Sequence, residues 1–246
     1  MNSALAVIFA AYAATMLDLA HERKIQGHND LESVAALVGT PPYEYTRVVA
    51  RVERPFDGFA FCTASRVGTN LFLTNYHCDQ PCASTQFRMG FVDGATPAQQ
   101  RLWKCGRLIH KEVEFDYALY EATPISGTAP FPVLTLWVGP LRDGQSVYLA
   151  SHPLGKAMEV DASEDCKILD ATAFLSAMGR MSIKHGCDTE SSSSGSPVLD
   201  RATGFGVALH WGGLDAYNEA IPMRLVVDSL RANAPEAVLQ LTLAGE

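Results

Sequence analysis

The chain of 246 residues is long enough to bury a full hydrophobic core, as one large domain or as two small lobes. Its composition, with 48% hydrophobic and 19% charged residues, is that of a folded globular protein. The net charge of -8 and the lack of any basic run argue against nucleic acid as the main partner, because phosphate binding needs a concentrated basic face.

The N-terminus allows two interpretations. The apolar stretch Ala4–Leu17 has the length and composition of a signal-peptide core, and Ala11–Ala13 resembles a small-x-small cleavage site. The start of the chain, however, carries no positive charge, which favours an apolar helix over Ala4–Ala20 packed on the domain. Neither interpretation predicts a stable membrane span, because the stretch is short and poorly flanked.

A second helix is predicted directly after this stretch. Asn29 and Glu32 have the spacing of a capping box, and Gly39 before two prolines is a stop signal. We therefore expect residues 1–44 to be an N-terminal helical extension: a leader, a pro-segment or appended helices.

From Tyr45 onward the chain consists of short β-type runs separated by turn residues. Strands at this spacing, without helical patterns between them, predict antiparallel barrels or sandwiches. Residues 122–133, rich in Pro, Gly and Ser/Thr, suit a crossover between two lobes, and residues 222–235 predict a closing helix.

The stretch CDTESSSSGSPVLD, residues 187–200, has the composition of a flexible linker, but it runs directly into a strand-like segment. The alternative is that Ser194 is a nucleophile, which requires an adjacent base and a group that orients this base. His77 ends the apolar run LFLTNYHC, and Asp116 opens an alternating run in EFDYALYE. These two residues are the candidate base and acid.

Three motifs in this order resemble those of the chymotrypsin-like serine proteases. TNYHC is similar to the family's Thr-Ala-Ala-His-Cys, DYAL to its Asp-x-Ala-Leu, and SSSSGSPV to its Gly-Asp-Ser-Gly-Gly-Pro. SGSPV and HWGG are similar in particular to the glutamyl endopeptidases of the bacterial branch. The resemblance extends over about Val48 to Leu230.

The resemblance implies a mostly β fold of two antiparallel six-stranded β-barrels, with a protease domain over residues 45–246. Lobe one would span about residues 45–122 and lobe two about residues 132–232. It implies a serine endopeptidase that needs no cofactor, acts on proteins or peptides and is a monomer. The alternative from another class is a catalytically silent binding module of the same fold.

The resemblance also assigns roles to residues. Ser194 is the expected nucleophile, His77 the general base and Asp116 the residue that orients it. The backbone N–H groups of Ser192 and Ser194 would form the oxyanion hole. Ser192 replaces a family glycine, which makes the turn harder if it needs a positive φ. Ser193 replaces the aspartate that pairs with a new N-terminus in zymogen-activated members.

Two sets of residues point to opposite substrate preferences. Asp188 matches the position that gives trypsin its preference for basic residues at P1, the substrate residue before the cleaved bond. Thr189 and His210 match positions that bind a substrate carboxylate in glutamyl endopeptidases. The acidic preference survives if the carboxylate of Asp188 points away and is capped by hydrogen bonds. Both preferences stay open at this point.

The six cysteines favour disulfides and an oxidising compartment, and therefore a secreted or periplasmic protein, although a packed N-terminal helix would allow an intracellular one. No metal site is expected, because the cluster of His77, Cys78 and Cys82 lacks a partner pair at zinc spacing. The family resemblance implies the pair Cys62 with Cys78. Proximity in sequence suggests the two remaining pairs, Cys82 with Cys105 and Cys166 with Cys187.

Overall fold

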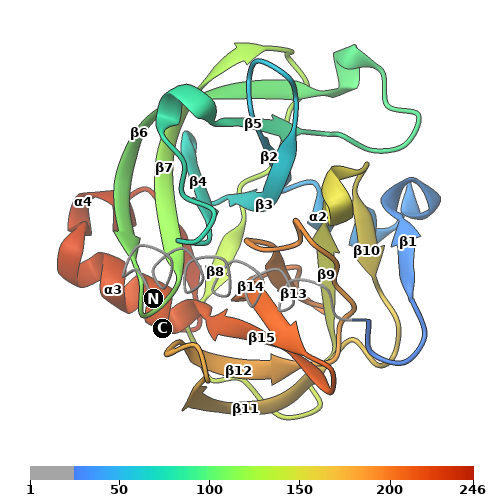
Figure 1. The fold of residues 1–246 in the computed structure, drawn as a ribbon, viewed down its shortest axis with the longest axis vertical. Coiled ribbons are helices and arrows are strands. Elements are labelled where there is room, and N and C mark those ends of the chain that lie inside the picture. The colour runs from blue at the N-terminus through green and yellow to red at the C-terminus, as the bar shows by residue number, and fades with distance from the viewer. Residues whose placement is uncertain (1–24) are drawn as a thin grey trace, which may run out of the picture.

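The structure is a computed structural model that describes residues 25–246. The predicted helix Ala4–Ala20 and the signal-peptide interpretation lie outside the described residues. Figure 1 shows a lobe formed by strands β2 to β7 above a second lobe that contains β9 and β11 to β15. No helix within residues 25–246 has the length and apolar character needed to cross a membrane.

The first lobe is a closed barrel with the strand order β2-β3-β4-β7-β6-β5. Its interior is filled by aromatic rings: Phe72 stacks on Phe87 with ring centroids 4.5 Å apart, and Trp103 packs edge-on against Phe72. All three side chains are buried, so the barrel is a packed core and leaves no channel. The strands are β2 (Val49–Glu53), β3 (Ala60–Arg66), β4 (Leu71–Thr74), β5 (Gln86–Met89), β6 (Arg101–Glu112) and β7 (Tyr117–Ser126).

The second lobe is built on a 10-stranded sheet with the main order β1-β10-β9-β13-β14-β15-β12-β11. Two further strands join it in parallel, with β8 pairing with β14 and β16 with β8. The strands are β1 (Leu31–Ser33), β8 (Thr135–Trp137), β9 (Val147–Ser151), β10 (Glu159–Asp161), β11 (Ile168–Leu175), β12 (Met181–His185), β13 (Pro197–Asp200), β14 (Gly206–Leu214), β15 (Tyr217–Pro222) and β16 (Thr242–Ala244).

The prediction of two closed six-stranded barrels is wrong for this second lobe. Closure would require β9 to pair with β11, but the contact is limited to the bridge between Ser146 and Lys167 and a few neighbouring backbone bonds. Strand β10 pairs with β9 from Leu149 to Ser151 and occupies the edge that β11 would need. Beyond Ile168, β11 has two register shifts along its pairing with β12. The sheet therefore stays open.

The predicted helix that begins at Asn29 and ends before Gly39 is also wrong. Residues Leu31–Ser33 form β1, which pairs antiparallel with β10, and a 3-10 turn over Val34–Leu37 follows. The side chain of Asn29 accepts a bond from the backbone N–H of Leu31 at 3.1 Å, which is a local turn rather than a helix cap. Backbone pairing with β10 therefore outweighs the local helix propensity indicated by the capping-box spacing. As a result, residues 31–33 are part of the second lobe.

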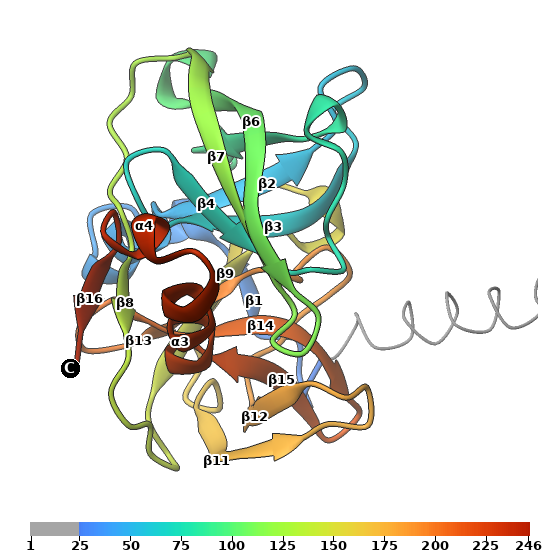
Figure 2. The same cartoon turned by 90° about the vertical axis from the view of Figure 1, so that its left-hand side faces the viewer.

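The predicted C-terminal helix is present as α3 (Met223–Asn233). Its buried face includes Val226, Val227 and Leu230, while the hydroxyl groups of Tyr117 on β7 and Ser229 on α3 lie 2.9 Å apart. Figure 2 shows α3 beside the strands of both lobes. The remaining helical segments are α2 (Pro41–Thr46), α4 (Pro235–Val238) and the 3-10 turns Cys82–Ser84, Pro97–Gln99 and Pro153–Gly155.

Three disulfides join the six cysteines: Cys62–Cys78, Cys82–Cys105 and Cys166–Cys187. These are the pairs expected from the sequence. The first ties β3 to the segment that carries His77, and the third ties the start of β11 to the segment before Asp188. Two edges of the candidate site are therefore covalently fixed.

Candidate active site

His77 and Asp116 lie next to each other at one end of the closed barrel. His77 follows β4, and Asp116 is the residue before β7, its neighbour in the sheet. The ring Nδ1 of His77 is 2.8 Å from Asp116 Oδ2, and the backbone N–H of His77 donates to Oδ1 at 3.1 Å. Asn75 donates from its side chain to the backbone carbonyl of Asp116 at 2.8 Å. The carboxylate is fully buried. Its two contacts with His77 fix the orientation of the imidazole.

The tight turn before β7 directs the carboxylate of Asp116 towards His77. Asp116 has a φ of +40°, and its N–H donates to the carbonyl of Val113 at 3.1 Å. Glu112 supports the turn, since its side chain accepts bonds from the N–H groups of Val113 and Glu114. Asp is one of the few residue types that tolerate this left-handed region.

Ser194 lies in the second lobe, but lobe one shapes its loop. Thr63 on β3 donates its backbone N–H to the carbonyl of Ser194 at 2.8 Å and its hydroxyl to the carbonyl of Ser192 at 2.9 Å. Gly195 has a φ of +88°, and a Cβ at this position would overlap the carbonyl oxygen of Thr63. Glycine is therefore required after Ser194. The hydroxyl of Ser194 donates to the carbonyl of Trp211 at 3.2 Å in this state.

The turn at Ser192 does require a positive φ. Its φ is +72°, so the serine adopts the left-handed conformation that the family glycine would adopt freely. Among residues 25–246, no protein acceptor receives a hydrogen bond from the backbone N–H of Ser192 or of Ser194. Ser193 is fully buried, and its hydroxyl donates to Ser151 within the same lobe at 3.0 Å.

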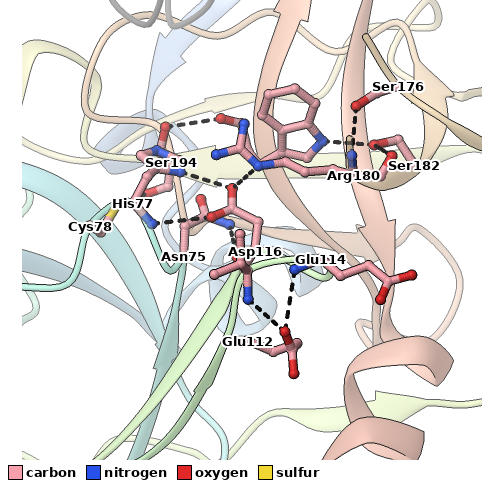
Figure 3. Close-up of polar contacts among 12 residues, drawn as sticks. Asn75, His77, Cys78, Glu112, Glu114, Asp116, Ser176, Arg180, Ser182 and Ser194 are labelled. Atoms are coloured by element: carbon pink, nitrogen blue, oxygen red, sulfur yellow. Dashed lines mark hydrogen bonds and ion pairs between the residues drawn. The ribbon is translucent and has the colours of Figure 1, made fainter. Parts of the chain in front are cut away.

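Sequence reasoning missed Arg180, which contacts Asp116 directly. Its Nε lies 3.1 Å from Asp116 Oδ2, and its guanidinium stacks on the ring of Trp211 at 4.3 Å. Figure 3 shows His77 and Arg180 both bonded to the carboxylate of Asp116, with Ser194 in the same cluster. Arg180 follows a short turn between β11 and β12, and no motif in the sequence marks it.

The carboxylate of Asp188 is bound to the N-terminal segment of the described chain. Its two oxygens accept backbone N–H groups of the N-terminal segment, from Gln26 at 2.6 Å and from Asp30 at 2.7 Å. The residue is 1% exposed, and burial raises the pKa of its carboxyl group. The N–H of Asp188 itself donates to Asp161 at 2.7 Å. Asp188 thus anchors the segment before β1.

His210 is part of a buried histidine pair, and the partner His185 was given no role from the sequence. Nε2 of His185 lies 3.1 Å from Nδ1 of His210, while the N–H of Cys187 donates to Nδ1 of His185. His185 must therefore carry its proton on Nε2 and donate it to His210, which leaves the proton of His210 on its own Nε2. Burial lowers the pKa of both rings, to about 3 for His185, so both are neutral at neutral pH.

Thr189 is buried next to Asp188 in the chain, and its hydroxyl has no hydrogen-bond partner in the part of the chain that the structure describes. A buried hydroxyl of this kind is unusual and is suited to meet a ligand. The Thr189 hydroxyl and the ring of neutral His210, which also forms a hydrogen bond with the backbone of Glu219, are the neutral donors at these two predicted positions.

A cavity of about 330 Å³ opens beside His77. A larger one, about 430 Å³, lies elsewhere, against Trp137, Arg142 and Thr203, and touches none of the three predicted catalytic residues. The smaller cavity, which His77 lines, is the one next to the candidate site. Its lining consists of Arg54, Phe59, Phe61, Cys62, His77, Cys78, Gln80 and Ser84.

The same region holds a group of possible metal ligands, the side chains of Cys62, His77 and Cys78, whose ligand atoms lie within 4.8 Å of one another. Both cysteines, however, are joined in a disulfide, and a disulfide sulfur is not the thiolate that binds a metal. The donor set therefore does not fit a metal ion.

Comparison with known proteins agrees with this geometry. The chain is similar in structure to a Glu endopeptidase solved in complex with MPD, with a TM-score of 0.62 and 17% sequence identity, over 88% of this chain and 100% of the other. At this identity the likeness shows the fold. No functionally curated protein matches the chain in sequence. The family described as trypsin-like peptidase domain matches residues 58–209, a segment that contains His77, Asp116 and Ser194 and more than half of the chain, and the protein belongs to that family.

Proposed function

We propose that the protein is a serine endopeptidase that uses His77, Asp116 and Ser194. The observation that carries this proposal is the 2.8 Å contact between His77 Nδ1 and a fully buried Asp116 carboxylate, in a chain with a family match that also includes Ser194. An imidazole held in this way presents its Nε2 to a serine hydroxyl and can accept its proton.

The reaction would proceed in two halves. His77 takes the proton of the Ser194 hydroxyl as the oxygen attacks the peptide carbonyl, and it then protonates the leaving amine. Water, activated by His77, hydrolyses the acyl-enzyme. Before attack, the Ser194 hydroxyl must leave the carbonyl of Trp211, which it contacts at 3.2 Å. The N–H groups of Ser192 and Ser194 would receive the oxyanion, and each such donor is worth about 3 to 4 kcal/mol of barrier.

For the P1 residue we propose an acidic preference. The carboxylate of Asp188 is occupied by the N–H groups of Gln26 and Asp30, so it is not free to attract a basic side chain. His210 and Thr189 supply neutral donors suited to a carboxylate, and His185 fixes the tautomer in which His210 carries its proton on Nε2; a glutamate substrate would compete with the backbone of Glu219 for the His210 ring. A glutamate side chain would be held by hydrogen bonds in a buried setting, where such bonds are strong.

The location of the protein is a further part of the proposal. Three disulfides support function in an oxidising compartment, outside the cell or in a periplasm. We propose a monomeric peptidase domain that uses no cofactor and does not bind nucleic acid. Residues 31–33 are part of this domain, because β1 pairs with β10.

The test is labelling of the full-length chain with a fluorophosphonate, beside the variant Ser194→Ala, followed by mapping of cleavage sites in a denatured protein mixture. We expect labelling that depends on Ser194 and cuts after Glu. Absence of labelling would favour a binding module of this fold instead. Cuts after Arg or Lys would refute the acidic preference and direct attention to Glu219, a buried acid on β15 paired opposite Gly212.

A further inference from the structure

We infer that Arg180, in the second lobe, is a positioning residue. It holds the carboxylate of Asp116, which in turn orients the imidazole of His77. This inference rests on the proposed function, because it assigns a role within the same site. The contact is direct, with Arg180 Nε 3.1 Å from Asp116 Oδ2. The same oxygen lies 2.8 Å from His77 Nδ1, and Oδ1 accepts the N–H of His77. The carboxylate is therefore fixed between two residues from different lobes (Figure 3).

Arg180 is itself held firmly in this orientation. Its backbone N–H donates to Ser176 Oγ at 3.1 Å, and its carbonyl accepts the N–H of Ser176 at 2.8 Å, which closes the turn between β11 and β12. The guanidinium lies over the ring of Trp211 at 4.3 Å, and the indole N–H of Trp211 donates to Ser182 at 2.9 Å. A planar cation stacked on a fixed ring loses little further freedom when it binds a carboxylate.

The turn that carries Arg180 also contacts the loop that carries Asp116. The backbone N–H of Met181 donates to the carbonyl of Glu114 at 3.4 Å. This bond joins the residue after Arg180 to a residue two positions before Asp116. The two loops are thus linked through the backbone as well as through the ion pair, although they belong to different lobes.

Burial of the Arg180 guanidinium indicates that its charge is compensated mainly by the carboxylate of Asp116. The Arg180 side chain is 12% exposed, and Asp116 is its one salt-bridge partner within residues 25–246. Its Nη1 atom is buried with no hydrogen-bond partner among these residues. A guanidinium in such surroundings costs free energy of desolvation, and the interaction with Asp116 offsets this cost.

The cation has two expected effects on the reaction. It holds the carboxylate of Asp116 in the orientation in which it accepts the Nδ1–H of His77. It also disfavours a second positive charge on His77, which keeps the imidazole neutral and able to act as a base. Within residues 25–246, the charged or titratable groups near this ring include Asp116, which contacts it, Arg54, which lines the same cavity, and the neutral His210, while Arg180 contacts the carboxylate oxygen that the ring also contacts. Loss of Arg180 should therefore raise the pKa of His77.

The experiment compares Arg180→Met and Arg180→Lys with the parent protein. Methionine retains an unbranched apolar side chain but removes the charge and the donor. We expect its kcat to fall about 10- to 100-fold with KM changed less than about 2-fold, since orientation of the base acts mainly in the transition state. Lysine restores a charge and one donor, and we expect it to recover at least about one third of the lost activity on a logarithmic scale.

The readout specific to positioning is the His77 imidazole. We expect NMR titration of the Met variant to give a His77 pKa higher by about half a unit or more, with the acid limb of kcat/KM displaced in the same direction. The matched control is Arg101→Met, because Arg101 also stacks on a tryptophan, Trp103, at 4.8 Å and within residues 25–246 has no hydrogen bond or ion pair with His77, Asp116 or Ser194. This control should leave both kcat and the His77 pKa unchanged.

Three results would overturn the inference: unchanged kcat and His77 pKa in the Met variant, a loss confined to KM, or an equal loss in the Arg101→Met control. If the Met variant does not fold, Arg180→Gln, which also removes the charge, decides by the same criteria, and parent-like kcat and His77 pKa in it would overturn the inference. Failure of the proposed function is seen separately, as a parent protein that a fluorophosphonate does not label, while the His77 pKa still reports on Arg180.

Discussion

The carboxylate of Asp188 accepts a 2.6 Å hydrogen bond from the backbone N–H of Gln26, a residue 162 positions earlier in the chain. Asp30 donates to the other oxygen, so one buried side chain holds both ends of a short segment. A residue that matches a specificity position of the family by sequence thus acts here as an anchor.

We expect Asp188→Asn to loosen this segment without changing substrate preference. The asparagine amide keeps one acceptor oxygen, but its NH₂ group faces one of the two backbone N–H groups. That N–H group loses its acceptor, which lowers the stability of the folded segment by about 1 to 3 kcal/mol. Limited proteolysis with mass spectrometry should show faster cutting within residues 25–33 than in the parent chain. A change in the P1 residue instead would show that Asp188 lines the substrate pocket.

Ser192→Gly should preserve labelling of Ser194 and should not lower the free energy of unfolding. Ser192 has a φ of +72°, a conformation that costs a serine about 1 kcal/mol and a glycine almost nothing. The greater freedom of glycine in the unfolded chain offsets part of this gain. Urea denaturation measures the difference. The contrasting variant is Gly195→Ala, which should destabilise the protein strongly, since its Cβ would overlap the Thr63 carbonyl.

The histidine pair predicts a specificity change on mutation of His185. In His185→Leu, Nδ1 of His210 loses its donor, and its proton is free to move to that nitrogen. We expect kcat/KM for a Glu peptide to fall about 10-fold or more, as for loss of a buried hydrogen bond to a charged group. His185→Gln, which can place an amide N–H near the Nε2 position, should recover part of this activity. Equal losses in both variants would contradict the tautomer argument.

The buried His152 predicts that acid weakens the fold. Burial lowers the pKa of its ring to about 3 from the ordinary 6.5. Below pH 6.5 the unfolded chain therefore binds a proton that the folded chain does not, and this ring's contribution to stability falls as pH falls from 6.5 towards 3. The slope for one such group is about 1.4 kcal/mol per pH unit.

His152→Asn isolates this effect, because an asparagine amide can still donate to the carbonyl of Lys156, which His152 Nδ1 contacts at 3.0 Å. Thermal unfolding at pH 7 and pH 5 should show a smaller acid-induced loss of stability in the variant than in the parent. Parallel curves for the two proteins would mean that His152 titrates normally.

Local sequence patterns predicted some features and failed at others for identifiable reasons. The closed barrel follows from short, alternating strands, and the motifs around His77 and Asp116 lie on neighbouring strands of that barrel. The capping-box pattern of Asn29 was misleading, because the open edge of β10 offers β1 a ladder of backbone bonds. Arg180 and His185 make their contacts across loops or strands distant in sequence, and no local pattern encodes such contacts.

Thr63, on lobe one, stabilises the conformation of the loop of lobe two that carries Ser194. It binds the carbonyls on both sides of Ser193, and its own carbonyl occupies the space that a side chain at Gly195 would need. Separation of the lobes would release all of these contacts at once. A molecule whose lobes begin to separate would therefore lose the conformation of the Ser194 loop before either lobe unfolds.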